Sequence, residues 1–565
     1  MSILNNKSLI LGVITVVVVI LLVELTSSTI TRAETVNTSV TVGNSAPAFT
    51  AGPAESTASD GTTPTNEGSN VTFQATATDG NAEDYYFAVC KTNSITPGGS
   101  GAAPTCGGGS WCITAAVDSG VQASCSYTTL GGDAESNAWF GFVCDNNTTS
   151  SACSLTSQGS GGTMSPFKVN HDPGFSVIVD NGGGGADSGA NPGGTITFTA
   201  TASDTDTDTA SDTVKLVVCA DTNGATASGC TGTQICTSSL AASAPNCQKS
   251  IASVAPDGNN NYYAYVFDSH NMGSGSNYRS GVYVINNVAP TVQALTLNAG
   301  ADISLPEGVT TNVPVTTTVR DYNSCQDITT VETGLYRTGI GYSACDTNGE
   351  DNDNYCYAQV TCTVVGGTCS GSTDELADYT CTVVMQYHAD PTDPTSGNVQ
   401  YPTEAWKNTV KVIDNNSASG NTEVASGVEV DTTAALDVTS SINYGSLDVG
   451  QKNDPLDKIT TVTATGNVGI DEELSGTNLT DGGSGLIAVA KQKHALAAST
   501  AYASGVALST TPTEYELNCF KTTVSVSPQT KNTWWGIEIP AGIPPGAYTG
   551  TNTVMAVLGE IGNWQ

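Results

Sequence analysis

The chain has 565 residues, of which only 12% are charged, and its 53 acidic residues outnumber its 17 basic residues to give a net charge of −36. Such a surface repels phosphate backbones, so the composition argues against nucleic acid as a partner. It attracts cations, Ca²⁺ above all, although acidity can also simply keep the surface soluble. Apolar residues make up 38%, which is below the globular average, so several small domains of short strands are expected.

The N-terminus carries a short hydrophobic segment. Lys7 precedes an apolar run from Leu9 to Val23, and Glu24 ends it. This run is short for a bilayer span but suits the core of a signal peptide. We predict a signal peptide over 1–33, cleaved after Ala33, followed by a linker over 34–43. An uncleaved anchor is the alternative, and it would be the chain's only membrane contact. Either way, the remainder is expected outside the cell or at the cell surface.

Two kinds of strand recur along the chain, and each ends in aspartate. The first kind reads "VTFQATATD", "ITFTATASD" and "VPVTTTVRD", and these copies end at Asp79, Asp204 and Asp321. Alternation of apolar residues with Thr predicts half-buried strands. The second kind reads "WFGFVCDNN", "YYAYVFDSHN" and "TVKVIDNN", and these copies carry Asp145, Asp268 and Asp414. The chain is therefore a row of similar modules.

A proline-containing linker precedes each copy, as in "NSAPAFT", "VNHDPGFSV" and "INNVAPTV". Proline cannot pair in a central strand, so it suits the entrance of a module. We predict modules over 44–170, 171–287 and 288–432, and a β-sandwich of a different type over 433–565. The expected fold class is all-β: tandem immunoglobulin-like β-sandwiches with disulfide-stapled loops, after one short N-terminal hydrophobic helix. Barrels are the alternative.

The chain has 17 cysteines, and each of the first three modules holds an even number of them: six, four and six. Cys519 is left over in the fourth module. Even numbers in an exported chain indicate disulfides. No interval is as short as zinc sites or redox centres require. The spacing C-x10-C-x5-C occurs at Cys219 and again at Cys345, and C-x15-C-x5-C occurs at Cys90.

Connectivity is open, because four cysteines already allow three pairings. Sequential closure is the working hypothesis. It gives Cys90–Cys106, Cys112–Cys125, Cys144–Cys153, Cys219–Cys230 and Cys236–Cys247. The pairs expected in the third module are Cys345–Cys356, Cys362–Cys381 and Cys325–Cys369. Cys519 is expected either to be buried in the fourth module or to be available to another subunit.

In an immunoglobulin-like sandwich the second and sixth strands end at the same pole. This predicts that Asp79 meets Asp145, and that Asp204 with Asp268 and Asp321 with Asp414 repeat the arrangement. Incoming linkers would add oxygens from Asn170, Asp172 or Asn287. Ca²⁺ takes six to eight oxygens, so each pole is a candidate calcium site. The alternative is that these side chains only form turn hydrogen bonds.

On these paired strands and aspartates, the modules resemble cadherin-like and PKD-like repeats of the wider immunoglobulin-like class. The resemblance implies calcium at module junctions that stiffens a rod. The chain departs from cadherins because it lacks their D-x-N-D-N linker, and "EDNDN" at 350 lies inside a cysteine loop. The acidic loops at 203 and 346 do not match helix–loop–helix calcium loops either.

No motif of a hydrolase, metalloprotease or nucleotide-binding enzyme is present. The Asp- and Thr-rich composition is similar to that of prokaryotic surface proteins of the surface-layer or adhesin type. The expected function is therefore a non-catalytic, exported structural protein: a surface-layer, stalk or matrix component. An adhesin or glycan-binding protein and a subunit of an extracellular filament are the alternatives, with a secreted enzyme as the remaining hypothesis. No cofactor is required for this role, with Ca²⁺ as the one candidate. Expected partners are other surface proteins, glycans or the chain itself.

Overall fold

The computed structural model describes residues 37–181, 189–206, 213–274, 277–345, 351–397 and 399–563. The predicted signal peptide or anchor lies outside these residues, as do parts of the acidic loops at 203 and 346. Two compact units divide at Val169 and Asn170. Within the described ranges, no helix combines the length and the apolar character needed to cross a bilayer.

The first module occupies the first unit, and its two main sheets each have three antiparallel strands. One is formed by β1 (Ala48–Glu55), β3 (Asn70–Thr78) and β8 (Gln122–Thr128), and the other by β10 (Phe140–Asp145), β4 (Tyr85–Cys90) and β7 (Ser110–Ile113). Smaller pairings involve β2 (Thr65–Asn66), β5 (Ile95–Thr96), β6 (Thr105–Cys106), β9 (Ser136–Asn137) and β11 (Phe167–Asn170). In β3 every second residue is buried, and Phe73 packs edge-on against Trp139. Period-two alternation therefore builds this core.

The second module shows the immunoglobulin-like order directly. One sheet joins β12 (Gly174–Asn181), β13 (Thr195–Ser203) and β18 (Asn246–Ser250). The other joins β17 (Gln234–Thr237), β14 (Val214–Cys219), β19 (Gly258–Asp268) and β20 (Arg279–Ile285), and β15 (Ala225–Thr226) pairs with β16 (Gly229–Cys230) in a loop. The first, second and fifth main strands thus face the third, sixth and seventh, as in an immunoglobulin-like sandwich. The fourth, β17, pairs with the third.

The third module keeps this order in one continuous sheet. Its strands are β21 (Thr291–Leu297), β22 (Thr311–Arg320), β25 (Leu376–Met385), β24 (Cys356–Val364), β23 (Ile328–Arg337), β26 (Trp406–Asp414) and β27 (Ser419–Glu423). The fourth strand in sequence, β24, pairs with both β23 and β25 and so connects the two halves. Trp406 is fully buried in the shared core.

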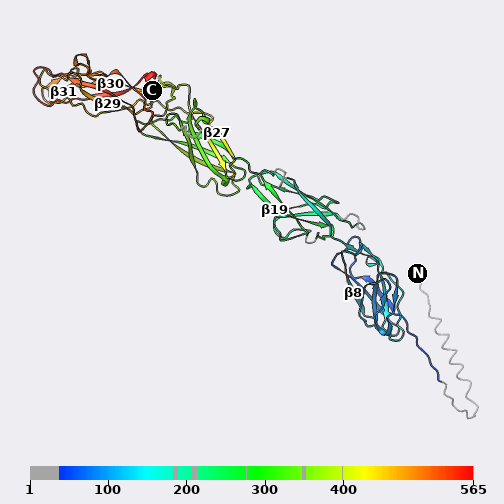
Figure 1. The fold of residues 1–565 in the computed structure, drawn as a ribbon. Coiled ribbons are helices and arrows are strands. Elements are labelled where there is room, and N and C mark those ends of the chain that lie inside the picture. Colours follow the sequence, from blue (N-terminus) through cyan, green and yellow to red (C-terminus); the bar gives the residue numbers. More distant parts are fainter. Residues whose placement is uncertain are drawn as a thin grey trace, which may run out of the picture. The chain divides into compact units, whose positions relative to one another are not determined.

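The fourth module has a different strand order. One sheet contains β28 (Leu436–Val438), β29 (Lys458–Ala464), β36 (Thr530–Ile537), β33 (Gln492–Ala495) and β34 (Val506–Ala507). The other contains β35 (Thr513–Cys519), β30 (Ile470–Gly476) and β37 (Asn552–Leu558), and β31 (Leu479–Thr480) pairs with β32 (Leu486–Ile487). Among the described residues, strands pair only within their own module; β8, β19, β27 and β29 mark one module each in Figure 1.

Helical segments within the described ranges are single turns. They are α2 (Tyr342–Cys345), η1 (Gly99–Gly101), η2 (Gly161–Thr163), η3 (Asn298–Gly300), η4 (Cys325–Asp327), η5 (Pro394–Ser396), η6 (Val489–Lys491), η7 (Tyr502–Ser504) and η8 (Ile561–Asn563). The fold is therefore all-β, with immunoglobulin-like sandwiches in tandem.

Disulfides join the cysteines in the expected pairs, which follow sequential closure in the first two modules. One pair in each of the first three modules closes the loop between the third and fourth main strands: Cys90–Cys106, Cys219–Cys230 and Cys345–Cys356. A second pair joins the fourth main strand to the fifth: Cys112–Cys125, Cys236–Cys247 and Cys362–Cys381. Cys144–Cys153 and Cys325–Cys369 are additional, and Cys519 is a buried free thiol. Closing loops of this size stabilises a domain by about 3 kcal/mol per bond in the chain-entropy account.

Candidate metal centres at the strand-end poles

In the first module the strand-end aspartates lie together at the pole that receives the linker. Asp79 follows β3 and Asp145 is the last residue of β10. With Glu83, from the turn after Asp79, each offers a carboxylate oxygen within 4.8 Å of the others. The linker contributes Asn44, whose Nδ2 donates to Asp145 Oδ2 at 2.7 Å.

Three oxygens at this pole are buried and have no hydrogen-bond partner. They are Asn44 Oδ1, Asp79 Oδ2 and Glu83 Oε2. The other oxygen of Asp79 accepts from the backbone N–H of Asn81 at 2.6 Å, which is an ordinary turn contact. Turn formation therefore accounts for one carboxylate oxygen of Asp79 and leaves the other unexplained. A buried acceptor without a donor is costly, so this geometry favours a bound cation.

The third module repeats this arrangement. Asp321 follows β22, Asp327 ends η4 and Asp414 ends β26, and these three also offer carboxylate oxygens within 4.8 Å of one another. Asn287 Nδ2 donates to Asp414 Oδ2 at 2.8 Å. The orphaned oxygens are the counterparts of those in the first module: Asn287 Oδ1, Asp321 Oδ2 and Asp327 Oδ2.

The pKa shifts at the third-module pole also favour a bound cation. Burial raises the pKa of Asp321, and the Asp414 carboxylate adds to the shift. Burial also raises the pKa of Asp327 to about 6, with further contributions from Asp257, Asp321 and Asp414. A cation in their midst would remove this repulsion and favour the ionised forms.

Asp257 belongs to the second module, so this pole draws on two modules. Its Oδ2 accepts from Asn416 Nδ2 at 2.5 Å, next to Asp414. The same contact surface includes Asn323 Nδ2, which donates to the backbone oxygen of Ala255 at 3.1 Å. The carboxylates of the third-module pole therefore lie where the second and third modules meet.

The second module is different. Asn170 Nδ2 donates to Asp268 Oδ2 at 2.7 Å, as in the other two modules. Asp204, however, does not join Asp268 in a group of three carboxylates among the described residues. Asp206 lies close by, but its carboxylate contacts the ring of His171 at 2.8 Å. The arrangement predicted for Asp204 and Asp268 is thus only partly formed.

An oxygen-only donor set suits a hard cation. Carboxylate and amide oxygens are ligands of Ca²⁺ and Mg²⁺, whereas softer metals take nitrogen and sulfur. The three orphaned oxygens and the Asp145 or Asp414 carboxylate supply part of the six to eight ligands of Ca²⁺. Water and backbone carbonyls supply the rest at such sites. The residues present therefore fit calcium.

Sequence reasoning found Asp79, Asp145, Asp321, Asp414 and Asn287, and missed the others. Asn44 carried a signal, because Asn44, Asn170 and Asn287 each begin an Asn-x-x-Pro linker. Glu83 and Asp327 stand at different distances from their partner strand ends, so no repeat marks them. A further acidic group, Asp471 with Glu516 and Glu560, lies in the fourth module. Two of its members are exposed, so water solvates them.

Comparisons with known proteins assign the chain to no family. No family model matches the chain, and no curated protein matches it. Among solved structures, the chain is similar to a Ca²⁺-stabilized adhesin of an Antarctic bacterium, with 14% identity, a TM-score of 0.28 and coverage of 92% of this chain and 100% of that one. It is also similar to a tetra-tandem repeat of a large adhesion protein's extending region (12% identity, TM-score 0.26, 89% and 97% covered). A 1.5-MDa bacterial ice-binding adhesin gives 14% identity, a TM-score of 0.23 and coverage of 67% and 97%. With TM-scores this low, these likenesses assign no function to the chain.

Proposed function

We propose that the chain is an exported, non-catalytic structural protein of the cell surface, a surface-layer, stalk or matrix component whose immunoglobulin-like modules bind Ca²⁺ at their strand-end poles. The observation that carries the proposal is the recurrence, in the first and third modules, of the same three orphaned oxygens beside a buried aspartate. One such set could arise from local packing. Two sets at equivalent positions indicate a common ligand.

The disulfides support export, and the surface charge supports the binding of cations. Eight disulfides are formed among the described residues, and such bonds persist in oxidising compartments. The net charge of −36 attracts cations to the surface. Extracellular calcium sites bind at 10⁻⁴ to 10⁻³ M in typical modules, so we expect affinities of about that order.

Calorimetric titration of the secreted chain with Ca²⁺ tests the proposal. We expect heat of binding for at least two sites and a melting temperature that rises with Ca²⁺ and falls with chelator. Asp79→Asn and Asp321→Asn should each remove part of the heat, whereas Asp437→Asn, an exposed acid on β28, serves as the matched control. Absence of binding, together with unchanged melting in chelator, would refute the calcium role.

The kind of surface role is tested separately by electron microscopy of the purified chain with and without Ca²⁺. A surface-layer or matrix component is expected to form ordered arrays or polymers. An adhesin is expected to stay monomeric and to retain a glycan or a partner cell. Filaments of fixed polarity would indicate the subunit of an extracellular fibre.

A further inference from the structure

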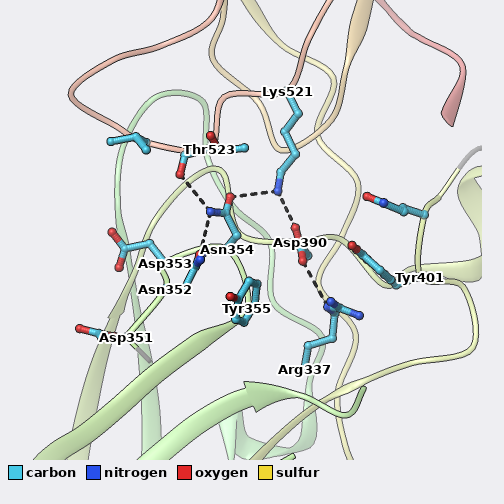
Figure 2. Close-up of a pocket in the computed structure, with 12 residues that line it drawn as sticks. Arg337, Asp351, Asn352, Asp353, Asn354, Tyr355, Asp390, Tyr401, Lys521 and Thr523 are labelled. Carbon is cyan, nitrogen blue, oxygen red and sulfur yellow. Dashed lines mark hydrogen bonds and ion pairs between the residues drawn. The ribbon is translucent and has the colours of Figure 1, made fainter. Parts of the chain in front are cut away.

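A lysine of the fourth module is buried against the third. Lys521 follows β35, and its side chain is enclosed, with 4% of the residue exposed. Its Nζ lies 2.5 Å from Asp390 Oδ1 and 3.1 Å from Asn354 Oδ1, and both partners belong to the third module (Figure 2). A primary amine, a carboxylate and a carboxamide therefore meet in one place.

The surroundings of Lys521 lower the pKa of its amine. Burial is the largest influence and lowers the pKa of Lys521; Asp390 opposes the shift and Arg337 adds to it. Arg337 Nε lies 3.2 Å from Asp390 Oδ2, and Arg337 also pairs with Glu404 at 2.5 Å. Asp390 is thus positioned to accept a proton from Lys521, and a deprotonated lysine is a nucleophile.

The Asn354 amide is held at both ends. Its Nδ2 donates to the backbone oxygen of Thr523 and to Asn352 Oδ1, each at 2.9 Å. Its Oδ1 contacts His388 Nδ1 at 3.2 Å as well as Lys521. Burial lowers the pKa of His388 to about 4, so the ring is neutral at pH 7. In the tautomer with its proton on Nδ1, His388 donates to Oδ1 and polarises the Asn354 carbonyl.

We propose that Lys521 and Asn354 form an isopeptide bond that covalently links the third and fourth modules. Lys521 Nζ attacks Asn354 Cγ, and the negative charge on Oδ1 is stabilised by His388. Asp390 takes a proton from Nζ and delivers it to Nδ2. The Cγ–Nδ2 bond then breaks and ammonia leaves, so that one amine and one amide become one substituted amide and NH₃.

The place of the reaction supports it in two further ways. Because the reacting groups are already in fixed contact, the reaction needs no bimolecular encounter, which lowers its entropic barrier. The three groups also line a cavity of about 570 Å³ that is open to solvent. Ammonia released there can diffuse away, which makes the reaction irreversible.

Mass spectrometry of the full, secreted chain after reduction and alkylation tests the proposal. We expect a mass lower than calculated by one ammonia. Trypsin cannot cleave after an acylated lysine, so peptide 494–531 should be recovered joined to peptide 338–407, and fragmentation should place the bond on Lys521 and Asn354. The calculated mass with two separate peptides would overturn the proposal.

Other outcomes are equally decisive. Loss of one water with a bond to Asp390 would overturn the assignment to Asn354. Loss of ammonia without joined peptides would indicate a cyclic imide and also overturn it. Lys521→Arg and Asp390→Asn should both restore the calculated mass, while Lys531→Arg, an exposed lysine of the same module, should keep the loss of ammonia. If a variant fails to fold, the unmodified chain still decides the question.

Discussion

Buried carboxylates have different partners at two contacts of the molecule. One contact lies between the second and third modules, and the other between the third and fourth. At the first, Asp257, Asp321, Asp327 and Asp414 gather, and no ion pair to a lysine or arginine is formed by them among the described residues. At the second, Asp390 contacts both Lys521 and Arg337. Isolated buried charge is strongly unfavourable. We therefore expect the first contact to take up an ion from solution, whereas at the second Arg337 supplies a cation from the chain.

The largest expected effect comes from removing the internal cation. Arg337→Ala deletes a buried charge that contacts Asp390 and Glu404, and breaking such a pair costs about 3–5 kcal/mol. We expect this loss in the free energy of unfolding to be the same in Ca²⁺ and in chelator, as measured by denaturant titration. A loss that appears only in chelator would mean that the two contacts are coupled and would break the comparison.

Removing the external cation should have the next largest effect. At a Ca²⁺ concentration a hundred times the dissociation constant, one site stabilises the native state by about 2.7 kcal/mol. Chelator should therefore lower the melting temperature of the wild-type chain. Hydrogen exchange should show faster exchange around Asp79 and Asp321 but unchanged exchange around Lys521. Uniform loss of protection along the chain would contradict a local role for the ion.

The effect of Asp321→Asn on stability should have opposite signs in Ca²⁺ and in chelator. In Ca²⁺ the variant loses a ligand, so it is expected to be less stable than wild type by about 1–3 kcal/mol, the range for an unsatisfied buried group. In chelator it loses a repelling charge, so it is expected to equal or exceed wild type. Thermal melts of both proteins measure this crossing. Asp321 could instead only stabilise its turn, by accepting the 2.8 Å hydrogen bond from the Asn323 N–H. In that case the stability difference between the variant and wild type would be the same in both conditions.

The smallest expected effect is on pH dependence. The pKa of Asp327 is raised to about 6 by burial and neighbouring carboxylates, and an unfolded Asp titrates near 3.9. A raised pKa means that the native state binds more protons, so stability in chelator should fall as pH rises from about 4 to 6. Ca²⁺ should reduce this fall because it favours the ionised form of Asp327. Asp327→Asn should reduce it without Ca²⁺.

Much of the fold follows from local pattern. Alternation in "VTFQATATD" places Phe73 inside β3, and Trp139 and Tyr262 are core residues at matching positions. Short cysteine intervals suit local loop closure, which is why sequential pairing agrees with the structure in the first two modules. The strand-end aspartates could be paired because two strands of a sandwich end at one pole. These inferences all rest on short-range periodicity.

The remainder depends on contacts that no local pattern encodes. Glu83 and Asp327 reach their poles through turns of different length. Lys521 stands 131 residues from Asp390 in sequence. The surrounding "CFKTTV" is typical of the residues that follow a strand, so nothing local marks this lysine. Only the packing of the fourth module against the third buries it. The strand order of the fourth module is likewise not encoded by any repeat, since its strands share none with the other modules.

Every disulfide among the described residues closes within a single module. Under the proposed export, we expect the disulfides of each module to form without waiting for the residues of later modules. Because domains fold as units in order of synthesis, this arrangement favours pairing within a module over pairing between modules.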